Sequence, residues 1–184
     1  MGRTGAYVES LNSPSLTDTI HNILPLQDFN TLATVGHLMA LALIIFYLLY
    51  LNPKQIPYAT LLFALLVLLR SITLSTTHLG PPLLRLDDVP VGEFFSGYYY
   101  TKDLFFSGHV GSTFLSFLII KSPKYFKYLF LVFPLLMAYA VLAMHVHYTI
   151  DIIGGFLFAY AVYAFGEKYL KKKIEQITNI EAED

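Results

Sequence analysis

Apolar stretches alternate with short polar breaks along most of this chain. Five of them approach the roughly 20 residues that an α-helix needs to cross a hydrocarbon core, and they lie at roughly 32–51, 58–79, 105–121, 128–146 and 149–167. Helix-breaking residues stand at their junctions, as in Asn52-Pro53, Gly80-Pro81-Pro82 and Ser122-Pro123. The pattern therefore predicts an all-α polytopic membrane bundle of about five transmembrane helices.

The segment 14–30 has a different pattern, in which Leu16 and Ile20 are interleaved with Asp18 and His21. It is too polar to span a membrane, so we expect an N-terminal interfacial helix there. No Gly/Ser linker or internal repeat divides the chain. We therefore expect residues 1–184 to form a single membrane-embedded domain, with 169–184 as a cytoplasmic tail.

Composition agrees with the apolar pattern and narrows the chemistry. The chain has 184 residues, of which 55% are hydrophobic and 14% are charged, and this is too apolar for an ordinary soluble domain. The absence of cysteine excludes disulfides, thiolate catalysis and cysteine-ligated metal. We expect an integral membrane protein that binds no nucleic acid and needs no cofactor or metal. Its oligomeric state is open.

Charge predicts how the helices are oriented. Lysines follow the first, third and fifth apolar stretches, namely Lys54, Lys121, Lys124, Lys127, Lys168, Lys171, Lys172 and Lys173. The alternate loops carry acids instead, namely Asp87, Asp88, Glu93 and Asp103. Because lysine and arginine accumulate in cytoplasmic loops, we expect the C-terminus in the cytoplasm. The N-terminus and residues 80–104 should then face the extracytoplasmic or lumenal side.

Three ionisable residues stand at the ends of apolar stretches on that second side. His109 opens the third stretch, and His147 and Asp151 follow 38 and 42 residues later at the junction of the last two. Ionisable groups at such positions are costly to hold and are functional candidates. Their common side in the predicted topology favours a shared site.

The spacing of these residues suits phosphoryl transfer. His147 and Asp151 are four apart, so in a helix they share a face about 6 Å apart along the axis. The carboxylate can then hold one imidazole nitrogen while the other attacks phosphorus, and a second histidine, His109, can protonate the leaving alkoxide. Backbone amides at Ser107-Gly108 suit an anionic oxygen. A structural hydrogen bond between His147 and Asp151 is the alternative interpretation.

Other polar residues in apolar surroundings have less specific interpretations. Arg70 lies about 13 Å below the outer end of the second stretch at 1.5 Å per residue. Snorkelling or a structural ion pair is as good an interpretation as a phosphate-bearing lipid headgroup. We interpret three further histidines, His21, His37 and His78, as polar tips at the membrane interface. His145 is expected to be structural.

Three segments resemble the sphingomyelin synthase family, a lipid-phosphotransferase branch of the type 2 phosphatidic acid phosphatase superfamily. The resemblance lies in Asp103-x-x-x-Ser107-Gly108-His109 and in His147-Tyr148-Thr149-x-Asp151, which are similar to that family's last two signature motifs. Arg70-Ser71-Ile72-Thr73, followed by Thr77, Leu79 and Pro82, is similar to an earlier motif at matching intervals. The three motifs stand in the family's order, and the resemblance spans about residues 14–168.

The resemblance implies a six-helix enzyme in which His147 is the nucleophile, Asp151 orients it and His109 is the acid-base group. The phospho-headgroup of a phospholipid would pass through a phosphohistidine to ceramide or another lipid alcohol, such as diacylglycerol. Substrate-binding residues would be Arg70, Asp103, Ser107, Gly108 and Tyr148. Thr101-Lys102 stands where the family has Cys-Gly, Val110 stands where it has Thr, and the family's first helix has no counterpart. These departures leave the substrate open.

Two other classes of function are alternatives. A lipid phosphate phosphatase uses the same triad but adds cations in a Lys-x6-Arg-Pro motif and a Ser-Arg pair; the first is absent here and the second is Ala140-Val141. This difference favours a diester donor over a phosphate monoester, although phospholipase C-like hydrolysis remains compatible. A membrane transporter with a His/Asp proton relay is the non-enzyme alternative. Its polar residues should be spread across the membrane, whereas here they gather at one face.

Overall fold

The computed structural model of the chain describes residues 2–86, 102, 104–121 and 123–180. This part of the chain is an all-α bundle without a β-strand, apart from an isolated bridge between Ser15 and Gly80. Four of its helices are long and apolar enough to cross a membrane, namely Asn30–Leu51, Pro53–Thr76, Lys124–Ala143 and Thr149–Ile174. The predicted fold class, a polytopic helical membrane bundle, is confirmed.

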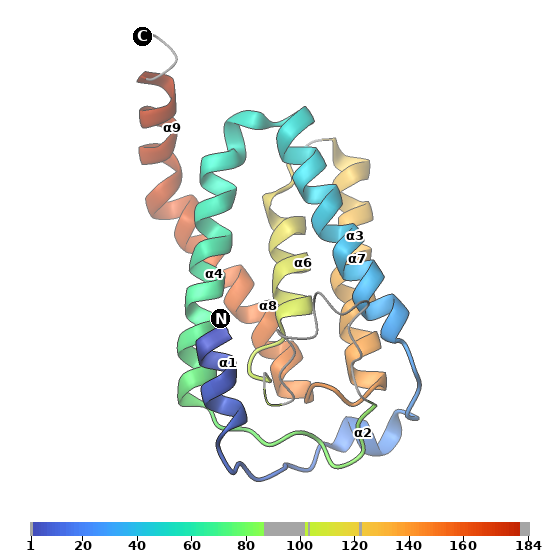
Figure 1. Cartoon of the computed structure of the whole chain (residues 1–184). Helices are drawn as coiled ribbons and strands as arrows, with labels where there is room; N and C mark the ends of the chain where they lie inside the picture. The colour runs from blue at the N-terminus through green and yellow to red at the C-terminus, as the bar shows by residue number, and fades with distance from the viewer. Residues whose placement is uncertain (1, 87–101, 103, 122, 181–184) are drawn as a thin grey trace.

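The helices are arranged side by side as a bundle (Figure 1). In chain order they are α1 Gly2–Glu9, α2 Thr19–Ile23, α3 Asn30–Phe46, α4 Ile56–Thr76, α6 Gly108–Ile119, α7 Lys124–Ala143, α8 Thr149–Phe165 and α9 Lys171–Ile180. Wider π-helical turns, Tyr47–Leu51 and Gly166–Leu170, extend α3 and join α8 to α9, and a 3-10 turn at Pro53–Gln55 leads into α4.

The third predicted stretch, 105–121, is helical only over Gly108–Ile119. A 12-residue helix is about 18 Å long, which is well short of a membrane's hydrocarbon core. This length is tolerated because α6 packs against α3, α4, α7 and α8, so the non-helical backbone at its ends is buried in protein. The N-terminus of α6 therefore begins inside the bundle.

The backbones of α6 and α8 approach closely. A Cβ atom on Gly155 of α8 would lie 3.0 Å from the Ser107 carbonyl oxygen and 3.3 Å from the backbone nitrogen of Gly111. Small residues at a helix interface allow this approach in membrane proteins. The contact fixes the start of α6 next to the first turns of α8, and these two places carry the predicted catalytic residues.

The predicted interfacial segment 14–30 contains one short helix, α2, and most of its other residues are in no regular secondary structure. Asp18 begins this helix by accepting a hydrogen bond from the Ile20 N–H at 2.9 Å. Leu24, which precedes Pro25, is extended at φ −85°, ψ 120°, because a following proline disfavours the α-region. The segment lies across the end of the bundle (Figure 1) and its polar groups bond to neighbouring loops.

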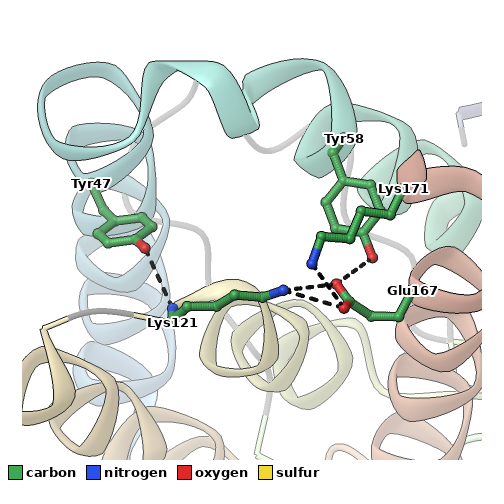
Figure 2. Close-up of polar contacts among 5 residues, drawn as sticks. All are labelled: Tyr47, Tyr58, Lys121, Glu167 and Lys171. Carbon is green, nitrogen blue, oxygen red and sulfur yellow. Dashed lines mark hydrogen bonds and ion pairs between the residues drawn. The ribbon is translucent and has the colours of Figure 1, made fainter. Parts of the chain in front are cut away.

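At the opposite, lysine-rich end of the bundle, Glu167 joins three elements (Figure 2). Its carboxylate accepts hydrogen bonds from Tyr58 at 3.0 Å, from Lys121 at 3.1 Å and from Lys171 at 3.1 Å. The backbone N–H of Lys121 donates in turn to the hydroxyl of Tyr47 at 3.4 Å. The group ties the end of α3, the start of α4, the α6–α7 junction and the start of α9 together.

Candidate active site

Asp151 organises the first turn of α8. One of its carboxylate oxygens, Oδ2, accepts the backbone N–H of Tyr148 at 2.9 Å and lies 3.3 Å from Nδ1 of His147. Asp151 is fully buried, and His147 is 5% exposed. The first contact closes a capping box at the helix N-terminus. One carboxylate thus caps α8 and holds the imidazole, which leaves Nε2 of His147 as the nitrogen free to react.

His109 lies at the start of α6 among three other groups that can carry positive charge. Its ring centroid is 4.7 Å from that of His37 on α3, with the planes inclined at 60°. His147 and Arg70 also act on it electrostatically. The structure therefore brings together His109, at the start of α6, and His147, in the turn before α8, as their shared side in the predicted topology indicated.

Arg70 approaches the N-terminus of α6. Only 7% of this residue is exposed. A Cβ atom built on Gly108 would lie 3.3 Å from the central guanidinium carbon, Cζ, and 3.4 Å from Nε. A glycine at position 108 thus lets the guanidinium lie against the backbone beside His109. Arg70 is thus turned inward instead of snorkelling, a placement that suits a structural pair as well as a phosphate ligand.

Ser107 completes this side of the site. The residue is fully buried, and its hydroxyl has no hydrogen-bond partner among the described residues. Its backbone N–H donates to the Asp151 carbonyl at 3.0 Å, and its carbonyl accepts from Gly111 at 3.0 Å. The N–H groups of the first helical turn lack intrahelical acceptors, so they and the hydroxyl form, with Arg70, a set of donors suited to an anionic oxygen.

Two predicted substrate-binding residues stand apart from this set. Asp103 lies outside the described residues. Tyr148 is 2% exposed, and its hydroxyl donates to the Gly80 carbonyl at 2.9 Å and accepts from the Leu16 N–H at 2.9 Å. Those two bonds tie three segments of the chain together around the turn before α8.

Two histidines interpreted as interfacial tips lie at or beside the site. His37 contacts His109, and Nε2 of His21 lies 3.0 Å from the His147 carbonyl oxygen. A signal in the sequence could have identified His37. It lies at helical spacing from Ala33 and Ala40, on the buried face of α3. His78 has a ring nitrogen 2.9 Å from the Ser75 carbonyl oxygen, and its ring packs edge-on against that of Tyr7, with centroids 6.0 Å apart.

His145 has the structural position that was expected for it. Its two ring nitrogens lie 2.9 Å from the Leu84 carbonyl oxygen and 3.3 Å from that of Leu24. Its ring stacks on His21 with centroids 4.2 Å apart. Burial lowers the pKa of His21, so at neutral pH the imidazole is uncharged, and its Nε2–H can donate to the His147 carbonyl.

Residues 102–168 match the protein-family model described as PAP2 superfamily C-terminal. No curated protein and no solved structure gives a match. The matched range contains the region between the start of α6 and the end of α8, and therefore His109, His147 and Asp151. Through this segment, the match supports the assignment of the chain to the type 2 phosphatidic acid phosphatase superfamily.

Proposed function

We propose that this membrane protein is a sphingomyelin synthase-like lipid phosphotransferase. The superfamily match supports an enzyme of the lipid phosphatase or phosphotransferase type. The observation that carries phosphoryl-transfer chemistry is the convergence of the His147–Asp151 pair, His109 and Arg70 at one end of the bundle. The choice of a transferase is supported by the absence of the phosphatase's cationic motifs. Its donor would be a phospholipid, and its acceptor ceramide or another lipid alcohol such as diacylglycerol.

In the first half-reaction, Nε2 of His147 attacks the phosphorus of the donor. The bond from phosphorus to the diacylglycerol oxygen breaks, and that oxygen takes a proton from His109. Asp151 holds Nδ1 of His147 and stabilises the positive charge that develops on the ring. The phospho-headgroup is then bound to His147 as a phosphohistidine, and diacylglycerol leaves.

In the second half-reaction, neutral His109 takes the proton of the acceptor hydroxyl. The acceptor oxygen attacks phosphorus, and the phosphorus–nitrogen bond breaks with its electron pair returning to His147. Arg70 and the Ser107 hydroxyl would bind the non-reacting phosphoryl oxygens, whose charge they stabilise in both steps. Water in place of the alcohol would give slow phospholipase C-like hydrolysis.

A lipid phosphate phosphatase is the second candidate, because the superfamily match covers that class as well. A phosphate monoester carries more negative charge than a diester, so it needs more cations. The absence of Lys-x6-Arg-Pro and of the Ser-Arg pair supports the diester instead, and we keep the transferase as the principal proposal.

The lysine distribution supports an extracytoplasmic or lumenal site. Lys54, Lys121 and Lys171 belong to one end of the bundle, and the turn that carries His147 belongs to the other (Figure 1). By the positive-inside tendency, the first end with the C-terminus would face the cytoplasm. The site would then act on lipids of the opposite leaflet.

The test compares donors with purified protein in lipid vesicles that contain a chelator. Phosphatidylcholine, phosphatidylethanolamine and phosphatidic acid are each supplied with and without ceramide, and lipid products are identified by mass spectrometry. We expect diacylglycerol and a headgroup-bearing ceramide from a diester donor, lost in His147→Ala and His109→Ala and retained in His78→Ala. Rapid phosphate release from phosphatidic acid without any diester product would identify a phosphatase instead.

A further inference from the structure

His37 is the member of the site that neither the motifs nor the proposed mechanism uses. It lies in the middle of α3, on the face that also buries Ala33, Gly36 and Ala40. This face packs against α6 and α7, so the imidazole points into the bundle. Its ring contacts that of His109, at the start of the short helix α6.

The two ring nitrogens of His37 are not both satisfied. Nδ1 is buried and has no hydrogen-bond partner among the described residues. A buried polar atom without a partner costs free energy of about 1–3 kcal/mol, and such atoms in a folded protein call for an explanation. An imidazole whose only role was to fill space would be replaced at lower cost by an apolar ring.

The charges around His37 indicate which kind of ligand would bind there. Arg70 acts electrostatically on His37, and His37, His147 and Arg70 all act on His109. Three imidazoles and one guanidinium therefore meet in a buried region, where a guanidinium attracts an anion more strongly than in water. An anion placed among them would also give the unpartnered Nδ1 of His37 and the Ser107 hydroxyl a hydrogen-bond partner.

We propose that His37 is a phosphoryl-oxygen ligand, which with Arg70 and the Ser107 hydroxyl binds the non-reacting oxygens of the substrate phosphate. The inference rests on the proposed function, because it concerns the same site. In this proposal, His37 of α3 and Arg70 of α4 bind the phosphate in place of the cationic residues of the phosphatase motifs. The ligand class is a phosphate ester group, whichever lipid carries it.

The role has a consequence for the charge that the site accepts. A guanidinium brings a full positive charge to a phosphate, whereas a neutral imidazole brings one hydrogen-bond donor and no charge. With His37 neutral, the pair matches the single negative charge of a phosphodiester. A neutral hydrogen-bond donor at position 37 should therefore be enough to bind a diester. A side chain without a donor at this position should bind it more weakly.

The experiment measures binding separately from turnover, with the full-length protein purified in detergent. Dimethyl phosphate, a singly charged diester, and orthophosphate are titrated while the melting temperature is followed, since a ligand of the folded state raises it. The variants are His37→Ala, His37→Asn and Arg70→Ala. His78→Ala, which removes a histidine that contacts the Ser75 carbonyl and the Tyr7 ring, is the matched control.

We expect dimethyl phosphate to bind His37→Ala about tenfold or more weakly than wild type, which is the size expected for a hydrogen bond to a charged group. His37→Asn should retain most of the binding, and His78→Ala all of it. Unchanged binding in His37→Ala, or no binding of either probe to wild type, would overturn the inference. Equal losses in His37→Asn and His37→Ala would also overturn it, because the donor would then be irrelevant.

The same measurement distinguishes this inference from the proposed function. If His37 controls binding but no diester donor is turned over, the ligand role stands and the transferase proposal fails. If diesters are turned over with His37→Ala at wild-type KM and kcat, the transferase proposal stands and His37 is a packing residue. An increase in KM with little change in kcat is expected, because His37 binds oxygens that do not react.

Discussion

At the residue scale, the site depends on side chains that serve the fold and the chemistry together. Asp151 closes the N-terminus of α8 and holds His147 with one carboxylate oxygen, Oδ2. Its other oxygen, Oδ1, is buried without a hydrogen bond among the described residues. Local structure, which needs only a hydrogen-bond acceptor at this position, does not explain why the acceptor is a charged carboxylate.

The substitution Asp151→Asn separates the two roles. An amide oxygen can still accept the Tyr148 N–H, so we expect the melting temperature to change little. The negative charge that stabilises an imidazolium is lost, so turnover should fall by roughly 10²-fold or more. Melting curves and single-turnover rates would be measured on the same preparation. Wild-type turnover would contradict the role of Asp151, and unfolding would show that its structural role dominates.

Gly108 tests the placement of Arg70. In Gly108→Ala the new methyl group lies 3.3–3.5 Å from three guanidinium atoms, so the side chain must shift by a few tenths of an ångström or more. We expect KM for the lipid donor to rise severalfold with a smaller loss in kcat. In a double-mutant cycle, Gly108→Ala should add little to Arg70→Ala, since both act through one guanidinium. Additive effects would contradict this explanation.

At the element scale, a short N-terminal strap holds the turn that carries His147. We use the name strap for residues 15–21. Leu16 bonds to the Tyr148 hydroxyl, His21 to the His147 carbonyl, and Asp18 accepts both the backbone N–H of Thr149 at 2.5 Å and its hydroxyl at 2.9 Å. The start of α8 is therefore capped partly by a residue from a distant segment.

The substitution Asp18→Asn tests the strap through the pH dependence of the protein's stability. Burial would raise the pKa of Asp18, but hydrogen bonds from Thr149 and Ile20 to the carboxylate outweigh it and hold the pKa below its usual value of 3.8. A lowered folded-state pKa means that the ionised carboxylate stabilises the fold above the unfolded pKa. This stability is lost as pH falls through the folded pKa.

We therefore expect wild type to melt above Asp18→Asn at neutral pH and the difference to shrink on acidification to about pH 3 or below. Melting temperatures between pH 2.5 and 7 would check this expectation. A difference that is constant with pH would mean that the charge of Asp18 contributes nothing. The variant Asp28→Asn is a useful control, because Asp28 bonds to the Asn30 N–H of its own helix start and leaves the strap intact.

At the scale of the whole molecule, the two ends of the bundle have opposite character. The end with Glu167 joins lysines and tyrosines of several helices (Figure 2), and the other end carries the strap and the His147 turn (Figure 1). Within the described residues, the connections after α3 and α6 belong to the first end, and those after α4 and α7 to the second. Function at a membrane requires that each end face one defined compartment.

Single cysteines would determine which compartment each end faces. The chain contains no cysteine, so each introduced thiol is unique. Leu83, which is 85% exposed beyond α4, and Lys124, which is exposed at the start of α7, mark the two ends. In intact cells, an impermeant thiol reagent should label Leu83→Cys if its compartment is the cell exterior, and Lys124→Cys only after permeabilisation. Labelling of Lys124→Cys alone would reverse the proposed orientation.

Much of the architecture could be predicted from the sequence because apolar length is a local property. Four of the five predicted spans correspond to helices long enough to cross a membrane, and their boundaries differ from the predicted ones by at most seven residues. The start of α6 was placed three residues too early and its end two residues too late. Hydrophobicity measures what can be buried, and it cannot distinguish burial in lipid from burial against four other helices.

The sequence by itself determined an all-α membrane fold and singled out His109, His147 and Asp151, because ionisable residues are rare and conspicuous in apolar stretches. It could not determine which other polar groups would join them. The approach of α6 to α8 at Gly155, the inward face of α3 at His37 and the reach of the strap to Thr149 all depend on contacts between segments distant in the chain. Such contacts are selected by the packing of whole helices, so only the tertiary structure decided them.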